Sequence, residues 1–465
     1  MAGIVEVHSI DHIPEAERRG KVWQQGPFWF MLNATVLTIL SGVYGALAGL
    51  SLTWSAVAIA VGTLFGTLFS AFHAVQGPRL GIPQMIQSRV QFGARGASLI
   101  LAVAVFMDVG FAVFFTIMGR DALGQLTGAH PPAYAGIIIA GATLAAVLGY
   151  HFLHRVQRVL SILAVVVFAV ITVGVVVESP FGHLFRQGGF VTTAFLLQFG
   201  ISASYQLTVA PLMSSYTRYL PKKVSGPAVF AVVFAGSALA AVWLEFLGAA
   251  VATAKPSEDF IAGLSGFGNS LVPGVGTALE ILTFVSMFGI VAVCLYEAML
   301  SGLSFVDAFR PVRTSARLRV SWVLALAVVV YVLVVALPVD YLTSYNSFLM
   351  LMLYFLVPWT SVNLADYYFV RRGRYAVAEL LRKDGGVYGR WAGKGIAAYL
   401  VGFAVMIPFF SNPLYSGPLA KDLGGSDITI LLGVPVATVA FLLLMRRHDF
   451  SRERELIDLR EMQRD

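Results

Sequence analysis

The chain has 465 residues, of which 58% are hydrophobic and 12% are charged, with a formal net charge of +7. Soluble globular domains carry about 25% charged residues, so this composition excludes a disordered chain and argues against a soluble enzyme. The single cysteine, Cys294, excludes a disulfide framework and a cysteine-based metal site. Repeated apolar runs reach the roughly 20 residues that a bilayer-spanning helix needs. They predict an all-α polytopic membrane protein without a cofactor.

Residues 1–26 are polar and charged and predict a cytoplasmic N-terminal arm without the apolar core of a signal sequence. Residues 447–465 form a charged tail, expected on the cytoplasmic face as a solvated end or a short helix rather than as a docking site. Between them we predict twelve apolar spans, which cover residues 27–50, 53–74, 97–119, 132–149, 158–178, 189–213, 225–252, 277–304, 319–338, 342–362, 394–410 and 427–446.

The basic residues orient these spans. With the N-terminus inside, the inner segments contain all of the 32 Lys and Arg residues except Arg120, Arg186, Lys255 and Lys421. Cytoplasmic loops carry such an excess of basic residues, and a miscounted span would invert every segment after it. The pattern therefore predicts twelve spans, cytoplasmic N- and C-termini, and a place in the cytoplasmic (plasma or inner) membrane.

The first and sixth spans contain polar and helix-weakening residues inside the apolar run. In the first span these are Asn33, Thr35, Thr38, Ser41, Gly42 and Gly45. In the sixth they are Gly200, Ser202, Ser204, Gln206, Thr208 and Pro211. Packing of small residues is one explanation. Broken helices at matching positions of two halves instead indicate a transporter's binding site, and spans one and six match if five spans form each half. We predict that both are discontinuous.

Four ionisable residues occur inside the apolar spans. Burying a charge at membrane depth costs free energy, so such residues usually face a bundle interior or an aqueous path. Asp108 lies in the middle of the third span and Glu297 in the eighth. These spans are again five apart, so both carboxyl groups are expected to flank one central site. Glu245 and Glu280 are expected near helix ends, where contact with a loop or with the membrane interface suffices.

Two long motifs carry a family resemblance. Residues 72–96 read FHAVQGPRLGIPQMIQSRVQFGARG, and residues 347–375 read SFLMLMLYFLVPWTSVNLADYYFVRRGRY. Shorter matches are IPEAERRGK near the start, NATVLTILSG in the first span and SSYTRYLP at 214–221. Through these motifs, over nearly its whole length, the chain resembles the purine–cytosine permease family, within the nucleobase–cation symporters.

The resemblance implies two five-helix inverted repeats, at 27–178 and 189–362, followed by two peripheral helices at 394–446. It implies that spans one, two, six and seven rock against a scaffold including spans three, four, eight and nine. A planar heteroaromatic substrate would sit near the midplane between spans one, three, six and eight, and would be imported together with a cation.

A nucleobase offers two flat faces and an edge of donors and acceptors, so its pocket needs a few aromatic and a few polar groups. Near the expected midplane Phe106 and Phe115 add to the available aromatic rings, although lipid contact or packing is the alternative for each Phe. The candidate substrate-binding residues are Asp108, Phe111, Phe114, Ser202, Ser204, Tyr205, Gln206, Cys294 and Glu297.

The chain departs from the family pattern at several of these positions. Asp108 stands where a Trp is common, and Ser215 where many members have an Asp. In the eighth span the positions that the family uses for sodium and substrate, with hydroxyl and amide side chains, hold Gly289, Ile290, Val291 and Cys294. Sodium needs oxygen ligands. Only a partial sodium site is therefore expected.

The candidate cation-coupling residues are Asp108, Glu297, Thr38 and Ser286. Thr38 or Ser286 would contribute to a partial sodium site together with backbone carbonyls of the first span. Burial disfavours the charged form of a carboxyl group, which makes Asp108 or Glu297 a carrier for a proton. We therefore favour H⁺ over Na⁺ as the coupling ion.

Other functions fit the residues less well. The eight His residues are scattered, and no Walker loop, dinucleotide fingerprint or nucleic-acid-binding pattern is present. A channel would need a filter loop or a ring-forming motif, and a transporter-derived sensor would need a signalling module. Within transport, the alternative cargoes are allantoin, hydantoin, uracil or a thiamine-like heterocycle, and Asp108 would favour a cationic or amino-bearing ring.

Overall fold

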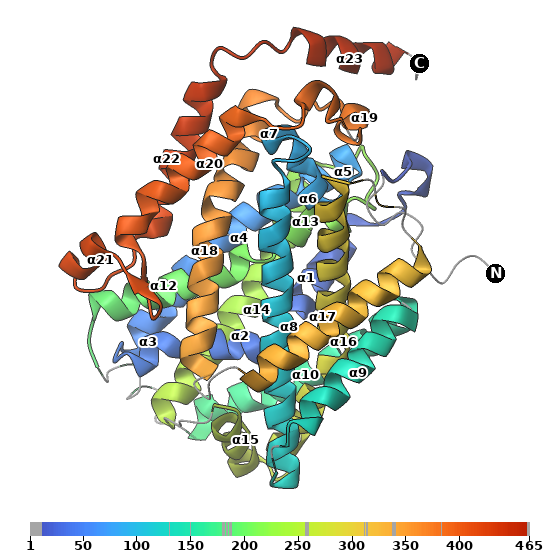
Figure 1. Ribbon diagram of the computed structural model, residues 1–465. Coiled ribbons are helices and arrows are strands. Elements are labelled where there is room, and N and C mark those ends of the chain that lie inside the picture. Colours follow the sequence, from blue (N-terminus) through green and yellow to red (C-terminus); the bar gives the residue numbers. More distant parts are fainter. Residues whose placement is uncertain are drawn as a thin grey trace.

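The computed structural model describes residues 12–462 except 130, 149, 179–181, 183–184, 186–187, 256–259, 311, 313–314, 337–340 and 383. Most of the described chain is helix, and long helices run side by side between two ends of the molecule (Figure 1). One end carries the C-terminal helix α23 (Ser451–Met462), and we call it the α23 end. The opposite end carries α15 (Phe260–Leu271), and we call it the α15 end.

Seven helices of the described chain are long and apolar enough to cross a membrane. They are α4 (Leu52–Ala74) with α5 (Gln76–Leu80), α8 (Ser98–Thr127), residues Val159–Val177 of α10 (Tyr150–Glu178), α14 (Gly226–Ala254), α16 (Val275–Asp307), α17 (Ala316–Ala336), and α18 (Tyr341–Ala365) with the π-helical turn η3 (Asp366–Val370). Shorter apolar helices are α9 (Ala133–Leu148), α20 (Gly393–Met406) and α22 (Thr429–Met445). All of them overlap predicted spans, and the protein is a largely helical membrane protein.

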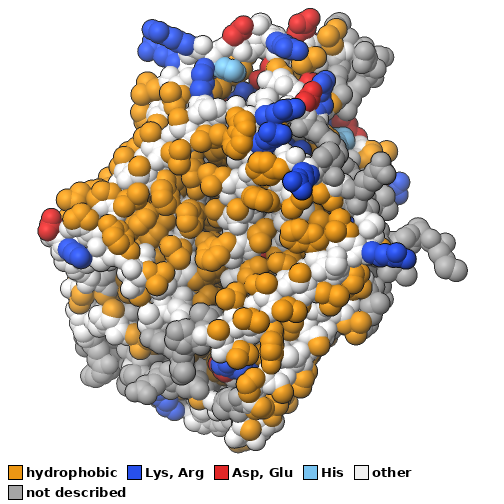
Figure 2. Space-filling model, in the orientation of Figure 1, with side chains coloured by type: hydrophobic (Ala, Val, Ile, Leu, Met, Phe, Trp, Pro, Cys, Tyr) orange, Lys and Arg blue, Asp and Glu red, His pale blue; other side chains and the backbone are white. Residues whose placement is uncertain are grey.

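The outer surface of the bundle is apolar. Large hydrophobic side chains such as Leu239 and Val328 are 65% and 63% exposed. Figure 2 shows hydrophobic side chains over the middle of the molecule, while many of the Lys and Arg side chains in this view gather at the α23 end. A soluble monomer rarely exposes such large apolar patches. This distribution fits a protein surrounded by lipid.

The first and sixth predicted spans are interrupted. The first consists of α1 (Gln25–Asn33), α2 (Val36–Ser41) and α3 (Val43–Leu47), and its two halves are bent by 68° at the break after Asn33. Thr35 has an extended backbone there, and its hydroxyl accepts a hydrogen bond from the Thr38 amide that caps α2. The sixth consists of α12 (Thr192–Leu207) and α13 (Ala210–Thr217), with a proline in the first turn of α13.

Glycines bring the helices around these breaks into backbone contact. A Cβ atom at Gly62 would lie 2.5 Å from the Phe199 carbonyl oxygen, so α4 and α12 touch through their backbones. A Cβ atom at Gly42, between α2 and α3, would collide with the backbone carbonyl of Glu245 on α14. Small residues permit such close approach between helices in lipid. The broken first span is therefore held tightly against α14.

Shorter elements lie between the long helices. They are η1 (Glu15–Glu17), η2 (Val22–Gln24), α6 (Gln84–Gln87), α7 (Arg89–Phe92), α19 (Val377–Leu380), η4 (Gly386–Tyr388), η5 (Ile407–Phe409), the hairpin of β1 (Ser411–Asn412) and β2 (Tyr415–Ser416), and α21 (Pro418–Asp422).

The C-terminal tail forms the short helix α23, as expected, but one of its charged side chains is buried rather than solvated. Glu453 of α23 is 5% exposed. Its carboxylate accepts hydrogen bonds from Arg371 Nε at 3.0 Å and from the Tyr388 hydroxyl at 2.7 Å. Arg371 also forms an ion pair with the buried Asp366. Burial by itself lowers the pKa of Arg371, but the two carboxylates raise it above its ordinary value. One charged residue of the tail, Glu453, is therefore buried and holds α23 against the rest of the protein. The sequence alone does not distinguish it from the solvated charges around it.

We predict that Arg371→Met lowers the melting temperature of the purified protein strongly, because it leaves two buried carboxylates without their cation. Breaking a buried ion pair in this way costs about 3 kcal/mol or more. The control is Arg374→Ala, since Arg374 pairs with Asp458 through side chains that are both 56% exposed. Such an exposed pair contributes about 1 kcal/mol or less. Equal melting temperatures for the two variants would contradict the docking of α23.

Candidate functional site

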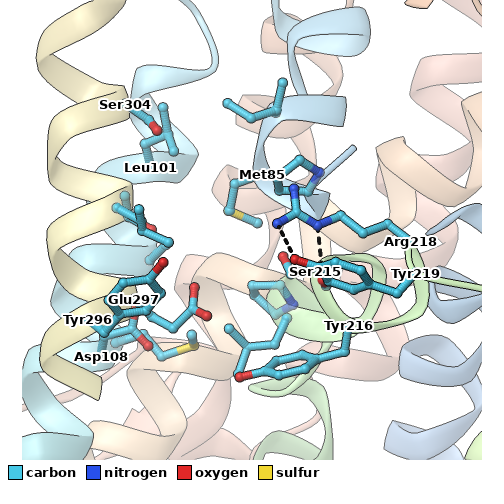
Figure 3. Close-up of a pocket in the computed structure, with 18 residues that line it drawn as sticks. Met85, Leu101, Asp108, Ser215, Tyr216, Arg218, Tyr219, Tyr296, Glu297 and Ser304 are labelled. Carbon is cyan, nitrogen blue, oxygen red and sulfur yellow. Dashed lines mark hydrogen bonds between the residues drawn. The ribbon is translucent and has the colours of Figure 1, made fainter. Parts of the chain in front are cut away.

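A cavity lies between α6, α8, α13 and α16 (Figure 3). The empty space amounts to about 710 Å³, part of which is open to solvent. The lining residues are Pro83, Met85, Ile86, Leu101, Ala104, Met107, Asp108, Pro211, Leu212, Ser215, Tyr216, Arg218, Tyr219, Tyr296, Glu297, Leu300, Ser301 and Ser304. The cavity thus joins the third, sixth and eighth spans with the loop after the second.

Asp108 and Glu297 project from one side of this cavity (Figure 3). Asp108 is 4% exposed, Glu297 is half-buried, and the two carboxyl groups interact electrostatically. Among the described residues no side chain or amide donates a hydrogen bond to the Asp108 carboxyl group. Two ionised carboxylates that line the same cavity repel each other. A proton, a cation or the N–H groups of a ligand would relieve that repulsion.

The helices place these groups by their periodicity. Glu297, Ser301 and Ser304 follow one another about one turn apart, so they lie along one face of α16. Helix α16 packs along α8. This face of α16 is turned toward α8 and therefore lies opposite Asp108. The eighth span brings a carboxyl and two hydroxyl groups to the cavity.

The opposite wall is formed by α13 and the residues after it (Figure 3). Arg218 Nε donates to the Ser215 backbone carbonyl at 3.2 Å, and Arg218 Nη2 donates to the Tyr219 hydroxyl at 3.3 Å. Tyr216 packs against Phe28 of α1, with ring centroids 4.9 Å apart. This wall combines a guanidinium group and aromatic rings, and hydrogen bonds hold it in place.

Ser202, Ser204, Tyr205 and Gln206, the candidate substrate-binding residues of the sixth span, lie elsewhere. All of these side chains are buried, and none belongs to the described lining of the cavity. Gln206 donates to Asn33 Oδ1 at 2.9 Å, and the Tyr205 and Thr38 hydroxyls are hydrogen-bonded at 2.7 Å.

Ser204 donates to the Leu349 carbonyl, and Ser202 donates to the Glu245 carboxyl group. The structure therefore engages the polar side chains of the sixth span in contacts with other helices. It brings Asp108 and Glu297 together in the cavity, but not these four residues.

The expectation that Glu245 lies near a helix end is wrong. This residue is fully buried in the interior of α14, where Ser202 and Thr63 donate to its carboxyl group. Sequence reasoning missed this position because its partners come from two other spans. Glu280 lies in the second turn of α16, close to a helix end as expected, and accepts a hydrogen bond from Ser265.

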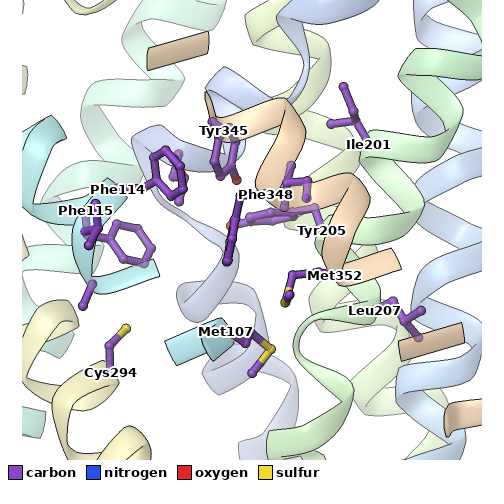
Figure 4. Close-up of a cluster of buried hydrophobic side chains, with 14 of the residues drawn as sticks. Met107, Phe114, Phe115, Ile201, Tyr205, Leu207, Cys294, Tyr345, Phe348 and Met352 are labelled. Atoms are coloured by element: carbon purple, nitrogen blue, oxygen red, sulfur yellow. The ribbon is translucent and has the colours of Figure 1, made fainter. Parts of the chain in front are cut away.

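The aromatic candidates Phe111, Phe114 and Phe115 form a ring cluster with Phe348 and Tyr345 (Figure 4). Phe111 and Phe114 of α8 lie 5.1 and 5.3 Å from Phe348 of α18, measured between ring centroids. Tyr345 lies 5.1 Å from Phe114. Phe348 is the central ring, and sequence reasoning missed it because nothing distinguishes it within the apolar tenth span.

The other candidates near this cluster differ in their surroundings. Phe115 is buried and stacks on Phe111 with centroids 6.0 Å apart, whereas Phe106 is 47% exposed on the outer surface. Cys294 is buried on α16 and interacts electrostatically with Asp108 and Glu297. The thiol lies about one helical turn from Glu297 along α16.

The two side chains considered for sodium have different surroundings, and the Thr38 hydroxyl lies 3.2 Å from the Thr35 hydroxyl. The Thr38 hydroxyl donates to the Asn33 carbonyl at 2.5 Å as well as bonding to Tyr205. Ser286 is buried about 16 Å from Glu297 along α16, and within the described chain no hydrogen bond joins it to Thr38. A hard cation needs several oxygens. No group of three or more His, Cys, Asp or Glu residues that could hold a metal ion occurs among the described residues.

Comparisons with known proteins agree with the fold and the motifs. Residues 12–433 match a family model described as a permease for cytosine/purines, uracil, thiamine and allantoin. YxlA of Bacillus subtilis, named among the purine-cytosine permeases, is 35% identical over 449 residues, covering 95% of this chain and 96% of that protein. The purine-cytosine permease fcyB of Emericella nidulans is 24% identical over 457 residues, covering 95% and 88%.

A solved structure shares the fold. Mhp1, a nucleobase-cation-symport-1 family transporter in a closed conformation with bromovinylhydantoin bound, matches with a TM-score of 0.74 and 18% identity. The match covers 96% of each chain. At this identity the likeness concerns the fold.

We predict that Phe348→Ala exposes Cys294 to a membrane-impermeant thiol reagent added at the α15 end. The ring of Phe348 packs on Phe111 and Phe114, and its removal leaves space that the surrounding core fills only in part. The labelling rate should rise several-fold, and Cys294 is the only possible target. The control is Phe403→Ala, because Phe403 stacks on Phe355 at the α20–α18 contact. A folded Phe348→Ala variant with unchanged labelling would contradict the barrier role of the ring cluster.

Proposed function

Because the chain belongs to the family of permeases for cytosine/purines, uracil, thiamine and allantoin, we propose that it imports a nucleobase or a related N-heterocycle of the cytosine/purine class. Transport is secondary active, proceeds by alternating access, and is coupled to a cation, with H⁺ favoured over Na⁺. The protein is a multi-pass membrane permease and not an enzyme.

The observation that carries this proposal is the cavity with Asp108 and Glu297 on one wall. The N–H and amino groups of a nucleobase are donors, and carboxylate oxygens accept from them in short, strong hydrogen bonds. Tyr216, Tyr219 and Tyr296 of the same cavity offer flat faces for a planar ring. Pockets for small molecules combine such apolar surfaces with a few polar groups.

The proposal includes twelve membrane spans and two five-helix inverted repeats, at 27–178 and 189–362. Breaks in the first and sixth spans support this repeat, as does the pairing of Asp108 and Glu297 from the third and eighth. Helices α20 and α22, within 394–446, pack on α18 and fit the peripheral pair.

The proposed orientation has both termini in the cytoplasm, and the proposed location is the plasma or inner membrane. The excess of Lys and Arg in alternate loops supports this orientation. The α23 end would then face the cytoplasm.

The preference for H⁺ follows from the available groups. Sodium would need oxygen ligands that Gly289, Ile290 and Val291 do not provide. A proton needs only a carboxyl group that changes its environment during the cycle, and Asp108 and Glu297 lie in the cavity where substrate would enter. One proton shared between these two groups removes their mutual repulsion.

The alternative is a carrier of another heterocycle, such as allantoin, a hydantoin, uracil or a thiamine-like compound. The family description includes three of these, and the Mhp1 structure holds bromovinylhydantoin. The names of YxlA and fcyB favour the cytosine/purine class. A channel or a transporter-derived sensor fits less well, because the sequence shows no filter loop or ring-forming motif and the relatives are named as permeases.

We predict that proteoliposomes containing the protein accumulate labelled cytosine when an inward proton gradient is imposed, and not with a sodium gradient alone. Hypoxanthine should compete more strongly than uracil, allantoin or thiamine, because it belongs to the purine class. Accumulation that requires sodium would overturn the proposed coupling. The absence of uptake of all these compounds under either gradient would overturn the substrate class.

We predict that Asp108→Asn or Glu297→Gln abolishes proton-driven accumulation while exchange of labelled for unlabelled substrate continues. One coupled proton contributes a factor of about ten to accumulation per unit of pH difference, since one unit equals about 1.4 kcal/mol. The matched control is Glu280→Gln, which alters a buried carboxyl group outside the cavity. If both cavity variants accumulate substrate like the wild type, neither carboxyl group carries the coupling proton.

A further inference from the structure

Asp108 is a buried acid without a hydrogen-bonding partner among the described residues. It is 4% exposed and lines the cavity, and no described side chain or amide donates to its carboxyl group. Figure 3 shows it on the same side of the cavity as Glu297, which is half-buried. A buried polar group that lacks a partner costs free energy. We therefore expect the partner of Asp108 to come from a ligand of the cavity.

The titratable groups of the cavity disfavour a negative charge on Asp108. Apart from Asp108 itself, they are Tyr216, Arg218, Tyr219, Tyr296 and Glu297. Arg218 belongs to the opposite wall, whereas Glu297 is on the same wall and interacts electrostatically with Asp108 (Figure 3). The Cys294 thiol also interacts electrostatically with Asp108. A charge on Glu297 makes a second negative charge beside it less favourable.

Helices α9, α15, α16, α17 and α18 pack against α8 and complete the surroundings of Asp108. Outside the cavity, the remaining titratable side chains of these helices and of α8 are Arg120, Asp121, Tyr134, Glu280, Asp307, Arg317, Arg319, Tyr331, Tyr341, Tyr345 and Tyr354. Arg317 and Arg319 lie in the first turn of α17, and Arg120 is about 18 Å from Asp108 along α8. An ionised Asp108 would thus be a buried charge beside a group of the same sign. Such a charge is costly inside a membrane, which favours the neutral acid.

Protonation changes what Asp108 can recognise. An ionised carboxylate only accepts hydrogen bonds, whereas a carboxylic acid donates from one oxygen and accepts at the other. A neutral Asp108 therefore fits a ligand edge on which a donor and an acceptor lie side by side. Cytosine has such an edge in a ring nitrogen next to an amino group, and hypoxanthine has one in a carbonyl next to a ring N–H. An ionised carboxylate would oppose the acceptor of either edge.

We propose that Asp108 binds the substrate and the coupling proton together, as a carboxylic acid paired with an adjacent donor and acceptor of the heterocycle. Its O–H donates to the ring nitrogen or carbonyl oxygen, and its C=O accepts from the neighbouring amino or ring N–H group. The substrate class is a neutral N-heterocycle with an amidine or lactam edge. Proton and substrate then strengthen each other's binding by the same factor. This inference rests on the proposed function and assigns both specificity and coupling to one side chain.

The test is equilibrium binding of labelled cytosine to the full-length protein in lipid nanodiscs, without any gradient, over a pH range in which cytosine stays neutral. Once Asp108 of the ligand-free protein ionises, binding requires the uptake of one proton. The affinity should then fall by up to about tenfold per pH unit. Calorimetry in buffers of different ionisation enthalpy should show uptake of about one proton per bound cytosine in the same pH range.

Asp108→Asn is the decisive variant, because a carboxamide keeps a donor beside an acceptor and does not ionise. Its affinity should no longer fall with pH, and its binding should take up no proton. Asp108→Ala should bind about tenfold more weakly than Asp108→Asn, since it loses both hydrogen bonds. Glu297→Gln should keep the fall with pH. Glu280→Gln alters a carboxyl group that is bonded to Ser265 outside the cavity, and it should follow the wild type.

A matched pair of ligands tests the recognised edge. Hypoxanthine methylated at C2 and C8 keeps its ring N–H groups, whereas its isomer methylated at N1 and N9 has none. The first should compete with labelled cytosine about tenfold more strongly or better, because a site built around a hydrogen bond rejects an analogue that lacks the donor. Equal competition by the two isomers would overturn the proposed edge.

The pH profiles decide between the proposal and its alternatives. A wild-type affinity that rises with pH would mean that the ionised carboxylate recognises donors alone, and a constant affinity would separate proton from substrate. Either result would overturn the proposal, as would a fall that persists in Asp108→Asn or an Asp108→Asn variant that binds no better than Asp108→Ala. All of these results would leave nucleobase transport intact. Absence of binding of every tested heterocycle at any pH would instead overturn the proposed function, and this assignment with it.

Discussion

The structure depends on one constraint, which is that backbone N–H and C=O groups freed at a helix break cannot be left unpaired inside a bilayer. The first span breaks after Asn33, and its open groups are satisfied by side chains. Thr38 donates to the Asn33 carbonyl, and Gln198 bridges the Ser41 carbonyl and the Gly45 amide. These bonds hold the broken sixth span against the broken first span.

This constraint separates two groups of polar residues. The hydroxyl and amide side chains of the sixth span complete the breaks, so they are buried in contacts between helices. The carboxyl groups that line the cavity are instead those of Asp108 on α8 and Glu297 on α16. These two helices pack along each other. One group joins the helices to one another, and the other lines the cavity. Glu245 of α14 is joined to the first group because it accepts a hydrogen bond from Ser202.

Much of the fold follows from the sequence because its signals are local. Apolar runs of membrane length mark the spans, and the polar interruptions near Asn33 and Thr208 mark the breaks. The pairing of Asp108 with Glu297 is predicted because the spans that carry them, the third and the eighth, lie five apart in the sequence. The buried contacts of Glu245 could not be predicted, because its partners Thr63 and Ser202 come from two other spans. The burial of Glu453 and the central place of Phe348 were missed for the same reason, because their contacts come from distant parts of the chain.

The central claim is that substrate binds beside Asp108 and Glu297, and the most direct measurement is an experimental density map of the protein prepared with the heterocycle that competes best in uptake. The account predicts density for a planar ring between α8 and α16, with a donor edge within hydrogen-bonding distance of at least one of the two carboxyl groups. Density for the ring at another position, with neither carboxyl group in contact with it, would contradict the account.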